Sequence, residues 1–296
     1  MRKEIVQLKK WLGYILNIMF ILCIIVLLMV LLQLFVFASF KIPTDSMEPI
    51  LVSGDYILVD KCSTGARIFN VMKALDDKEV SIYRMPGWRD FERNDIIVFN
   101  FPYPRKKDSI GFNVMKYYVK RCVALPGDTF EIKDATYSVR GYKGFLGNVR
   151  SQGILKNIIE RGDENYYGIV FKGRMFGSLG WSIANFGPFY VPKKGDCIPM
   201  FGKHALLYRN LIEWEQRKKL VCRGDTVWLG DSIIRRYRFR ENYYFVAGDR
   251  VANSQDSRYW GLLPEPFIVG KAVRIWKSVD PLTGKVRWDR VWKRIE

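Results

Sequence analysis

The chain has 296 residues, of which 49% are hydrophobic and 26% are charged. That length allows a membrane anchor together with one large domain or two smaller ones. The formal net charge of +18 suits an anionic partner, either nucleic acid or a phospholipid surface. Because the basic residues are spread in short groups without a nucleic-acid motif, we expect no nucleic-acid partner. Attraction to an anionic lipid bilayer accounts for the charge more simply.

The first element in the chain is a long apolar run. Residues 11–40 carry no charged side chain. As a helix, this run is long enough to cross a hydrocarbon core of roughly 30 Å. Four basic residues precede the run and only Lys41 follows it closely, so the positive-inside rule exports residues 41–296. A cleavable signal peptide is the alternative, because Ala38 and Ser39 are small, but its apolar region should span only about 7–15 residues.

One serine follows this run closely. Pro43 and Pro49 bracket Ser46, and because proline disfavours a regular helix between them, we predict a fixed turn. Even in a fully extended chain, Ser46 lies at most roughly 20 Å beyond the run. We therefore expect it to face outward at the bilayer surface. The alternative is that Asp45 or Ser46 caps a short helix.

Beyond the anchor, β-branched and aromatic runs bounded by Gly, Pro, Asp or Asn predict strands. The clearest runs are residues 55–60, 95–101, 116–123, 243–246 and 267–276. Leu125–Asp128 has Pro and Gly at the two central positions of a tight turn. The fold class predicted is mostly β, with a largely antiparallel sheet after an N-terminal transmembrane helix.

Two segments are less regular than these strands. Residues 131–240 are rich in Gly, Tyr and basic residues, and we interpret them as an inserted β-rich lobe. Residues 63–90 look like a shorter insertion, in which Val71–Leu75 is the best helix candidate. We divide the chain into a cytoplasmic tip with a single anchor, residues 1–40, and an extracytoplasmic domain, residues 41–296.

A serine hydroxyl needs a neighbouring base before it can act as a nucleophile. The single histidine, His204, lies in a segment without a nucleophile or base signature, which argues against a Ser-His-Asp triad. Lys120 is the better base, because its apolar run would desolvate the ammonium and Arg121 adds a like charge beside it. The alternative for Lys120 is an edge-strand lysine that reaches water.

Cysteine and histidine usage bears on cofactors. The five cysteines include no C-x-x-C pair, and with one histidine in the chain we expect no metal and no organic cofactor. Four cysteines outside the apolar run could form disulfides in an oxidising compartment: Cys62, Cys122, Cys197 and Cys222.

A polar segment, residues 247–261, separates two of the predicted strands. Its density of Asp, Asn, Ser and Arg predicts a structured loop, in which Asp256 pairs with Arg258 and Ser254 hydrogen-bonds a nearby amine. A solvated turn of similar composition is the alternative.

Together these clusters resemble the type I signal peptidases, membrane-bound Ser-Lys endopeptidases that remove signal peptides from exported preproteins. Ser46-Met47 with Pro49 is similar to the nucleophile box of that family, and Gly54-Asp55 to the short box after it. The likeness covers the anchor and residues 41–62, 93–130 and 243–276, which include the lysine region Tyr118–Asp128 and the last box Gly248–Gly261.

The resemblance implies a role for each site residue. Ser46 would be the nucleophile and Lys120 the general base, while Thr44 and the Ser46 amide would form the oxyanion hole. The implied supporting residues are Ser254, which would orient the lysine, and the ion pair of Asp256 with Arg258. The implied fold is a β-rich core with a more variable β lobe.

The resemblance also implies preprotein substrates, held extended against strand edges and cleaved after small residues. Residues near Ser46 that are candidates for lining the substrate pockets are Ile42, Ile50 and Val52. Three positions depart from the family pattern: Ile50 replaces a usual threonine, Asn94 a common glycine, and Arg250-Val-Ala252 the usual Asn-Arg-Asp. None removes the nucleophile or the base, so activity is expected.

Two rival functions remain open at this point. One is a membrane-tethered, basic, β-rich binding protein with a degenerate site, in keeping with the +18 charge and the altered residues 250–252. The other is a self-cleaving Ser-Lys regulator, against which the anchor and the absence of a DNA-binding helix pair both argue.

Overall fold

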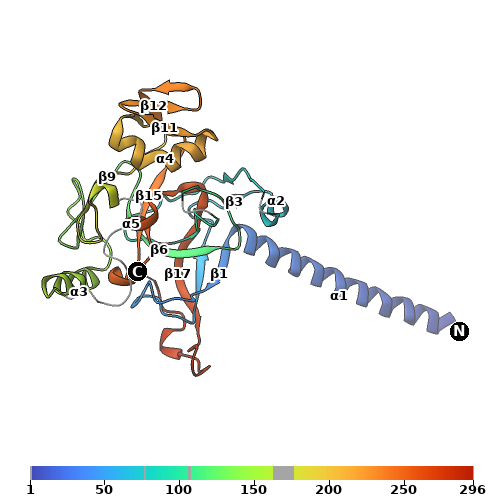
Figure 1. Ribbon diagram of the computed structural model, residues 1–296. Coiled ribbons are helices and arrows are strands. Elements are labelled where there is room, and N and C mark those ends of the chain that lie inside the picture. Colours follow the sequence, from blue (N-terminus) through green and yellow to red (C-terminus); the bar gives the residue numbers. More distant parts are fainter. Residues whose placement is uncertain (1, 77, 106–107, 163–176, 296) are drawn as a thin grey trace.

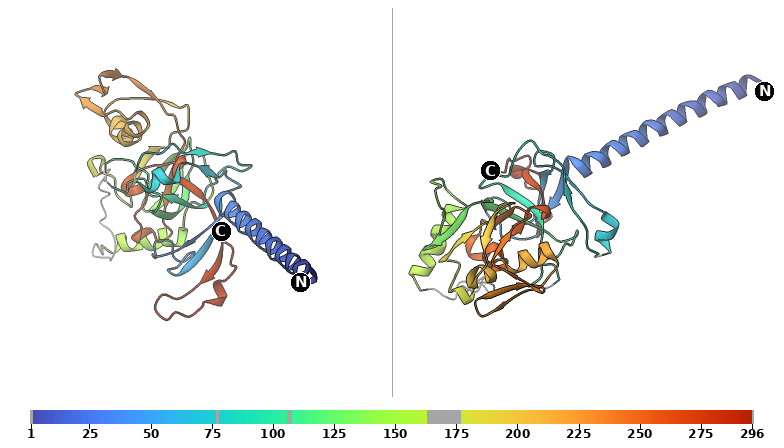
Figure 2. Two further views of the ribbon diagram at one scale, coloured as in Figure 1. Left: turned by 90° about the vertical axis from the view of Figure 1, so that its right-hand side faces the viewer. Right: turned by 90° about the horizontal axis from the view of Figure 1, so that it is seen from above.

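The computed structural model describes residues 2–76, 78–105, 108–162 and 177–295. Part of the expected inserted lobe, residues 163–176, therefore lies outside the described residues. The first helix, α1 (Arg2–Phe35), projects away from the rest of the molecule in every view (Figures 1 and 2). Its segment Lys10–Phe35 is long and apolar enough to cross a membrane and is not buried against the rest of the chain.

The apolar run predicted as one span is divided in the structure. The helix ends at Phe35, and Phe37–Lys41 form the strand β1, which pairs antiparallel with β2 (Asp55–Asp60). Alternating exposed and half-buried residues in β1 fit a strand with one face against the domain. The chain therefore passes from the helix into the sheet with only Val36 between them.

Lys61 joins the end of α1 to this sheet. Its Nζ donates to the carbonyl oxygens of Gln33, at 2.7 Å, and Leu34, at 3.2 Å, and its amide donates to the carbonyl of Val36 at 2.9 Å. A cation at a helix C-terminus satisfies carbonyls that have no partner within the helix and complements the helix dipole.

The main sheet has seven strands in the order β1-β2-β17-β5-β6-β15-β16, and each neighbouring pair is antiparallel. The strands not yet bounded are β5 (Ile96–Asn100), β6 (Tyr117–Ala124), β15 (Tyr243–Ala247), β16 (Leu263–Pro264) and β17 (Ile268–Ser278). Each of the five strand runs predicted from sequence overlaps one of these strands or β2. The predicted β-rich fold with an N-terminal apolar helix is confirmed.

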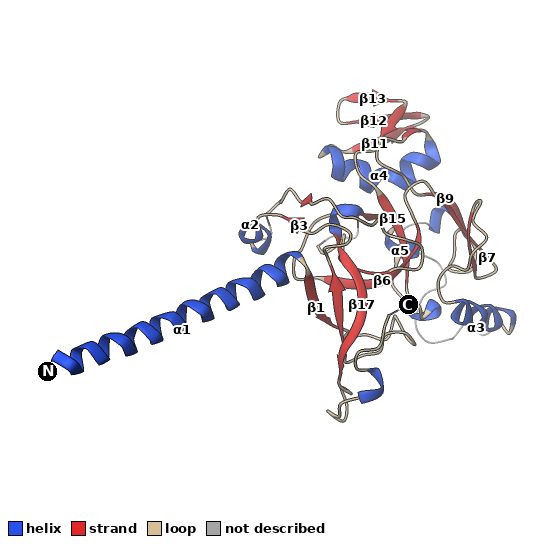
Figure 3. Ribbon diagram, turned by 180° about the vertical axis from the view of Figure 1, so that it is seen from behind, coloured by secondary structure: helices blue, strands red, loops and turns tan. Residues whose placement is uncertain are grey.

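The remaining elements surround this sheet (Figure 3). The smaller sheets contain β3 (Arg67–Ile68) with β4 (Tyr83–Arg84), β7 (Thr129–Lys133) with β8 (Thr136–Val139) and β9 (Phe186–Tyr190), β10 (Cys197–Pro199) with β14 (Arg236–Arg238), and β11 (Leu220–Arg223) with β12 (Thr226–Leu229) and β13 (Ser232–Ile234). Among the described residues, the other α-helices are α2 (Val71–Leu75), α3 (Val149–Glu160), α4 (Gly202–Gln216) and α5 (Ser257–Trp260). Short 3-10 turns are η1 (Gly177–Leu179), η2 (Val251–Asn253), η3 (Glu265–Phe267) and η4 (Trp288–Arg290).

Helix α2 coincides with the predicted Val71–Leu75, whereas α3 and α4 were not predicted within the segment interpreted as β-rich. The local sequence signal for α3 is its N-cap: the side chain of Asn148 accepts a hydrogen bond from the amide of Ser151. Helix α4 has no side-chain cap, and Arg217 after its end adopts a left-handed conformation where glycine is more usual. The boundaries of the lobe, residues 131–240, stay a prediction.

Two hydrophobic clusters form the core. The larger one contains many aromatic side chains from the main sheet, the β7–β9 sheet and α4, and includes Phe130, Phe189, Tyr208 and Phe245. The smaller cluster packs Met47 and Leu51 against strands of the main sheet. Because both residues are buried, they hold the chain around Ser46 against the sheet.

Candidate active site

Ser46 lies in the loop of residues 42–54, here called the Ser46 loop, between β1 and β2. The base of the loop is closed by two backbone hydrogen bonds: the amide of Ile42 donates to Asp55 at 2.8 Å, and that of Gly54 donates to Ile42 at 2.9 Å. The predicted turn is present as a hydrogen bond from the amide of Glu48 to the carbonyl of Asp45, at 3.0 Å.

The buried carboxylate of Asp55 fastens this loop to the C-terminal part of the chain. It accepts from the Ser278 hydroxyl at 2.7 Å and from two nitrogens of Arg290, at 3.0 and 2.6 Å. Burial alone would raise the pKa of Asp55, but these hydrogen bonds and the Arg290 charge leave that pKa below its ordinary value. Arg290 also donates to the carbonyl of Ile50 at 2.8 Å, so the loop is tied at two points.

Lys120 and Ser46 meet at the centre of the site. Lys120 lies on β6 opposite Ile97 of β5, and its Nζ is 2.5 Å from the Oγ of Ser46. The lysine is 4% exposed. Burial lowers its pKa to about 8, with Asp256 acting to raise it and Arg258 to lower it.

The cation expected to act on Lys120 was Arg121, and the structure corrects this. Successive residues of a strand point to opposite faces, so Arg121 turns away from Lys120. Its guanidinium pairs with both carboxylate oxygens of Asp249, each at 2.7 Å. The positive charge that lowers the pKa of Lys120 is instead that of Arg258.

Gly248 lets two parts of the site approach each other closely. A Cβ at this position would lie 2.1 Å from the Oγ of Ser254 and 2.6 Å from the carbonyl oxygen of Ser46. Only glycine therefore fits between them. Ser254 is 1% exposed, and among the described residues its Oγ has no hydrogen-bond partner.

Asp256 and Arg258 form the buried ion pair that the sequence predicts. The Nε and Nη2 of Arg258 each donate to a different carboxylate oxygen of Asp256, both at 2.8 Å. Asp256 also accepts from the amide of Gly248 at 3.0 Å, and Arg258 donates to the carbonyl of Val251 at 2.9 Å. The pair thus holds the backbone at Gly248 and Val251, both of which precede Ser254.

A cavity of about 370 Å³ opens beside Ser46 and Lys120. Residues of two segments form most of its wall, 40–47 and 117–120, with Asn253 and Gln255 at one side. Ile42 lines it as expected, whereas Ile50 and Val52 are not among the lining residues. Thr44 lines the cavity and is exposed, with no hydrogen bond in the part of the chain that the structure describes.

The remaining candidate groups lie elsewhere. His204 is on α4, where its Nδ1 is 2.8 Å from the carbonyl oxygen of Pro199, and it does not line the Ser46 cavity. The cysteines, all in described segments, are free thiols. Within the described ranges, no group of three or more Asp, Glu, His and Cys side chains gathers as a metal site would require.

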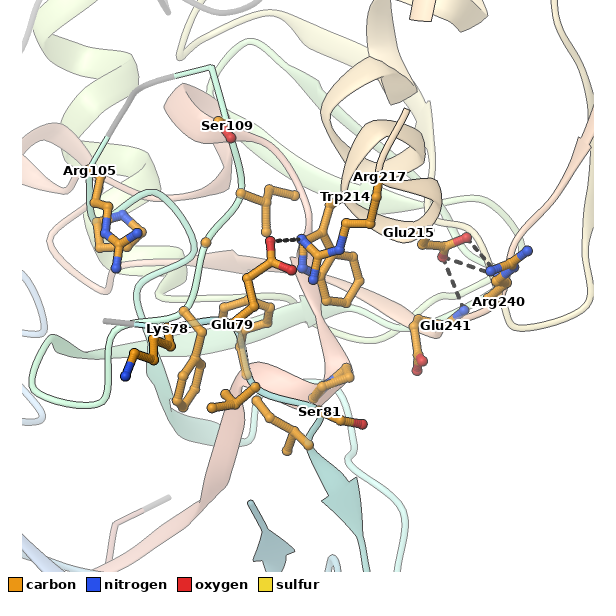
Figure 4. A pocket seen from close by; sticks show the side chains of 18 residues that line it. Lys78, Glu79, Ser81, Arg105, Ser109, Trp214, Glu215, Arg217, Arg240 and Glu241 are labelled. Carbon is orange, nitrogen blue, oxygen red and sulfur yellow. Dashed lines mark hydrogen bonds and ion pairs between the residues drawn. The ribbon is translucent and has the colours of Figure 1, made fainter. Parts of the chain in front are cut away.

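A larger cavity, of about 750 Å³, lies among residues 78–82, 104–105 and 109–112 and the end of α4 (Figure 4). Two of its charged side chains form an ion pair, Arg217 with Glu79 at 2.9 Å. None of the site residues discussed above lines it, so we give it no part in the chemistry at Ser46.

Sequence reasoning missed one contact at the site. Arg250, noted only as a departure from the family pattern, forms an ion pair with Asp45, the residue before Ser46. The unusual arginine was itself the available signal, but its partner lies 205 residues earlier in the chain.

Comparisons with known proteins agree on one family. The model of the family described as signal peptidase, peptidase S26, matches residues 14–163 and 203–277, well over half of the chain. The chain belongs to this family and is accordingly a peptidase, a hydrolase of the group that processes signal peptides.

Individual relatives carry the same name. A signal peptidase I of Pseudomonas aeruginosa is 29% identical over 86% of this chain and 69% of its own length. One from Buchnera aphidicola is 28% identical over 83% of this chain and 70% of its own. A solved signal peptidase I structure from Enterococcus faecalis covers 62% of this chain and 97% of its own, at 20% identity and a TM-score of 0.29.

Replacing Gly248 by alanine is expected to lower activity at least about 100-fold, because the added methyl group must displace the carbonyl of Ser46 or the side chain of Ser254. Gly153→Ala in α3 is a matched control, since a Cβ there meets nothing within 4 Å. Peptidase assays would measure the activity of both variants, and thermal unfolding would measure their stability. Equal activities would show that the close approach at Gly248 is not needed.

Proposed function

We propose that this chain is a signal peptidase I, a serine endopeptidase that uses a dyad of Ser46 and Lys120 to remove N-terminal signal peptides from exported preproteins. The observation that carries the proposal is the 2.5 Å contact between the Lys120 amine and the Ser46 hydroxyl, at the wall of a cavity. This intact contact favours a peptidase over a basic binding protein with a degenerate site.

The environment of Lys120 suits a general base. With a pKa of about 8, roughly a tenth of the amine is neutral at pH 7, far more than for an ordinary lysine. The neutral amine takes the proton from Ser46 as the oxygen attacks the scissile carbonyl. The ammonium then returns a proton to the leaving amine, and water hydrolyses the resulting acyl-enzyme with Lys120 again acting as base.

The oxyanion would be held by the amide of Ser46 and the hydroxyl of Thr44. Neither donor makes a hydrogen bond to another described residue, so both are free for a substrate oxygen. Ser254 we propose as the residue that orients the Lys120 amine: its buried hydroxyl has no hydrogen-bond partner in the described chain and lies against Gly248.

The substrate would bind extended beside β1, which is an edge strand of the main sheet. The cavity lies between this strand and the start of β6, with apolar walls from Phe40, Ile42 and Val119. An extended peptide can hydrogen-bond the free edge of a strand while its side chains enter small apolar pockets, which suits small residues before the scissile bond.

We further propose that α1 anchors the chain in the cytoplasmic membrane, with its N-terminus in the cytoplasm and residues 41–296 outside as the catalytic domain. The support is the apolar helix Lys10–Phe35 and the cluster of basic residues before it. A substrate whose signal peptide spans the same bilayer would then present its cleavage site on the side where Ser46 lies.

Incubation of the detergent-solubilised protein with a preprotein bearing a small-x-small site tests the proposal. We expect a single cut after that site, identified by product mass, and no cut by Ser46→Ala. A Ser53→Ala variant, at a half-buried hydroxyl in the same loop that donates only to the carbonyl of Pro43 at 3.3 Å, serves as the control and should keep activity. Cleavage by Ser46→Ala at the parent rate would overturn the proposed nucleophile.

A further inference from the structure

Arg250 touches the Ser46 loop through both its backbone and its side chain. Its amide donates to the carbonyl oxygen of Ser46 at 3.1 Å. Its guanidinium forms an ion pair with Asp45 and lies 3.6 Å from a carboxylate oxygen of Glu48. One residue therefore contacts the position of Ser46 and a carboxylate on each side of it.

Asp45 is the carboxylate that matters most for the chemistry. It precedes Ser46, lines the same cavity and accepts a second hydrogen bond, from Asn253 at 3.3 Å. Asp45 is 41% exposed and Arg250 42%, so their ion pair adds little to the folding free energy. An effect of Arg250 should therefore appear in the local electrostatics and in the loop geometry.

Lys120 lies in a field set by several charged groups. The charged groups that act electrostatically on its amine are Asp45 in the Ser46 loop and Asp249, Asp256 and Arg258 after β15. The ring of Tyr118, on the same strand as Lys120, lies 5.9 Å from the amine. Burial lowers the pKa of the amine most strongly, and Asp45 opposes that effect. An arginine that neutralises Asp45 thus helps to keep the amine neutral.

We propose that Arg250 is a positioning residue for the Ser-Lys pair: it holds the Ser46 loop against the segment after β15 and neutralises Asp45 beside the reacting groups. The inference rests on the proposed function of Ser46 and Lys120. It gives a purpose to the Arg250-Val-Ala252 sequence, in which Val251 is buried and offers its carbonyl to Arg258.

The pH dependence of cleavage by four proteins tests this role: the parent, Arg250→Gln, Asp45→Asn and the double variant. Removing Arg250 leaves Asp45 unpaired, so the pKa of Lys120 should rise and the acidic limb of kcat should move up by about half a pH unit. Asp45→Asn should move the limb down. In the double variant the limb should return close to that of the parent, because both charges are gone.

Without Arg250, the Ser46 loop should also shift from its position against the segment after β15. We expect this shift to lower kcat about 10-fold for Arg250→Gln, with KM nearly unchanged. Lys219→Gln is the matched control, since it also removes one exposed cation from an ion pair, here with Glu213 at 2.8 Å. Its kinetics and pH limb should equal those of the parent.

Competitive acetylation of Lys120 at a series of pH values, followed by mass spectrometry with Lys219 as internal reference, reports the amine's titration without a substrate. This measurement separates the role of Arg250 from the proposed dyad of Ser46 and Lys120. Activity retained in Ser46→Ala would overturn the dyad, whereas the acetylation profile would still report on Arg250. An unchanged Lys120 titration in Arg250→Gln, or a double variant shifted as far as Arg250→Gln alone, would overturn the inference.

Discussion

Replacing Lys120 by methionine is expected to abolish signal-peptide cleavage and, at neutral pH, to make the folded domain more stable. The first effect should reach at least about 10⁴-fold, because no other described amine or imidazole hydrogen-bonds Ser46 and could serve as its base. The second follows from the cost of burying an ammonium, which the neutral methionine of similar length does not incur.

The pH dependence of the stability gain has a definite sign. The pKa of Lys120 is lowered by burial from 10.5 to about 8, so below pH 8 the amine is protonated in both the folded and unfolded states and the full burial penalty is present. Between pH 8 and 10.5 the unfolded state binds more protons, so wild-type stability rises with pH. The penalty is about 3 kcal/mol at most and vanishes above pH 10.5.

Urea unfolding of both proteins at pH 7 and near pH 10 would measure this difference. We expect Lys120→Met to be more stable at pH 7 and the gap to shrink at the higher pH. Lys219→Met, at an exposed lysine, is the matched control and should show no such convergence. A methionine variant that is less stable than the parent at both pH values would contradict the desolvated state of Lys120.

Asp256→Asn should be the most destabilising of the substitutions considered. It leaves the guanidinium of Arg258, which is 1% exposed, without its counter-charge in the interior. Loss of one partner of a buried pair typically costs about 3–5 kcal/mol. The amide of Gly248 also loses a charged acceptor, so the backbone at Gly248, which packs between Ser46 and Ser254, should loosen.

Chemical denaturation and a cleavage assay at low temperature would record both consequences. The double variant Asp256→Asn with Arg258→Met should recover part of the stability, because the unpaired charge is removed together with its partner. Glu160→Gln, which breaks an exposed pair with Lys156, is the matched control and should cost less than about 1 kcal/mol. A cost that small for Asp256→Asn would mean that the pair is not structural.

Local sequence patterns predicted the strands well, because β-branched and aromatic runs mark chain segments that are buried on a pleated surface. They also singled out Ser46 and Lys120, whose side chains the structure brings together from positions 74 residues apart. The functional roles of these residues and of Thr44 and Ser254 stay predictions, and the boundaries of the lobe, residues 131–240, do too.

Other features depend on contacts that no local pattern contains. The turn of Arg121 toward Asp249 depends on strand alternation and on a partner 128 residues away. The pairing of Arg250 with Asp45 likewise requires two distant loops to meet. Gly248 could be read as a turn residue, but only the fold reveals that it is squeezed between Ser46 and Ser254.

The junction between α1 and β1 bears on which peptide bond of a substrate would reach Ser46. Only Val36 separates helix from strand, and Lys61 binds the last carbonyls of the helix, so there is no slack tether between them. In a bilayer, the height of Ser46 above the lipid would then be set by the protein's own framework and would change only when the helix tilts. The scissile bond would then be selected by its distance from the membrane as well as by the substrate side chains beside it.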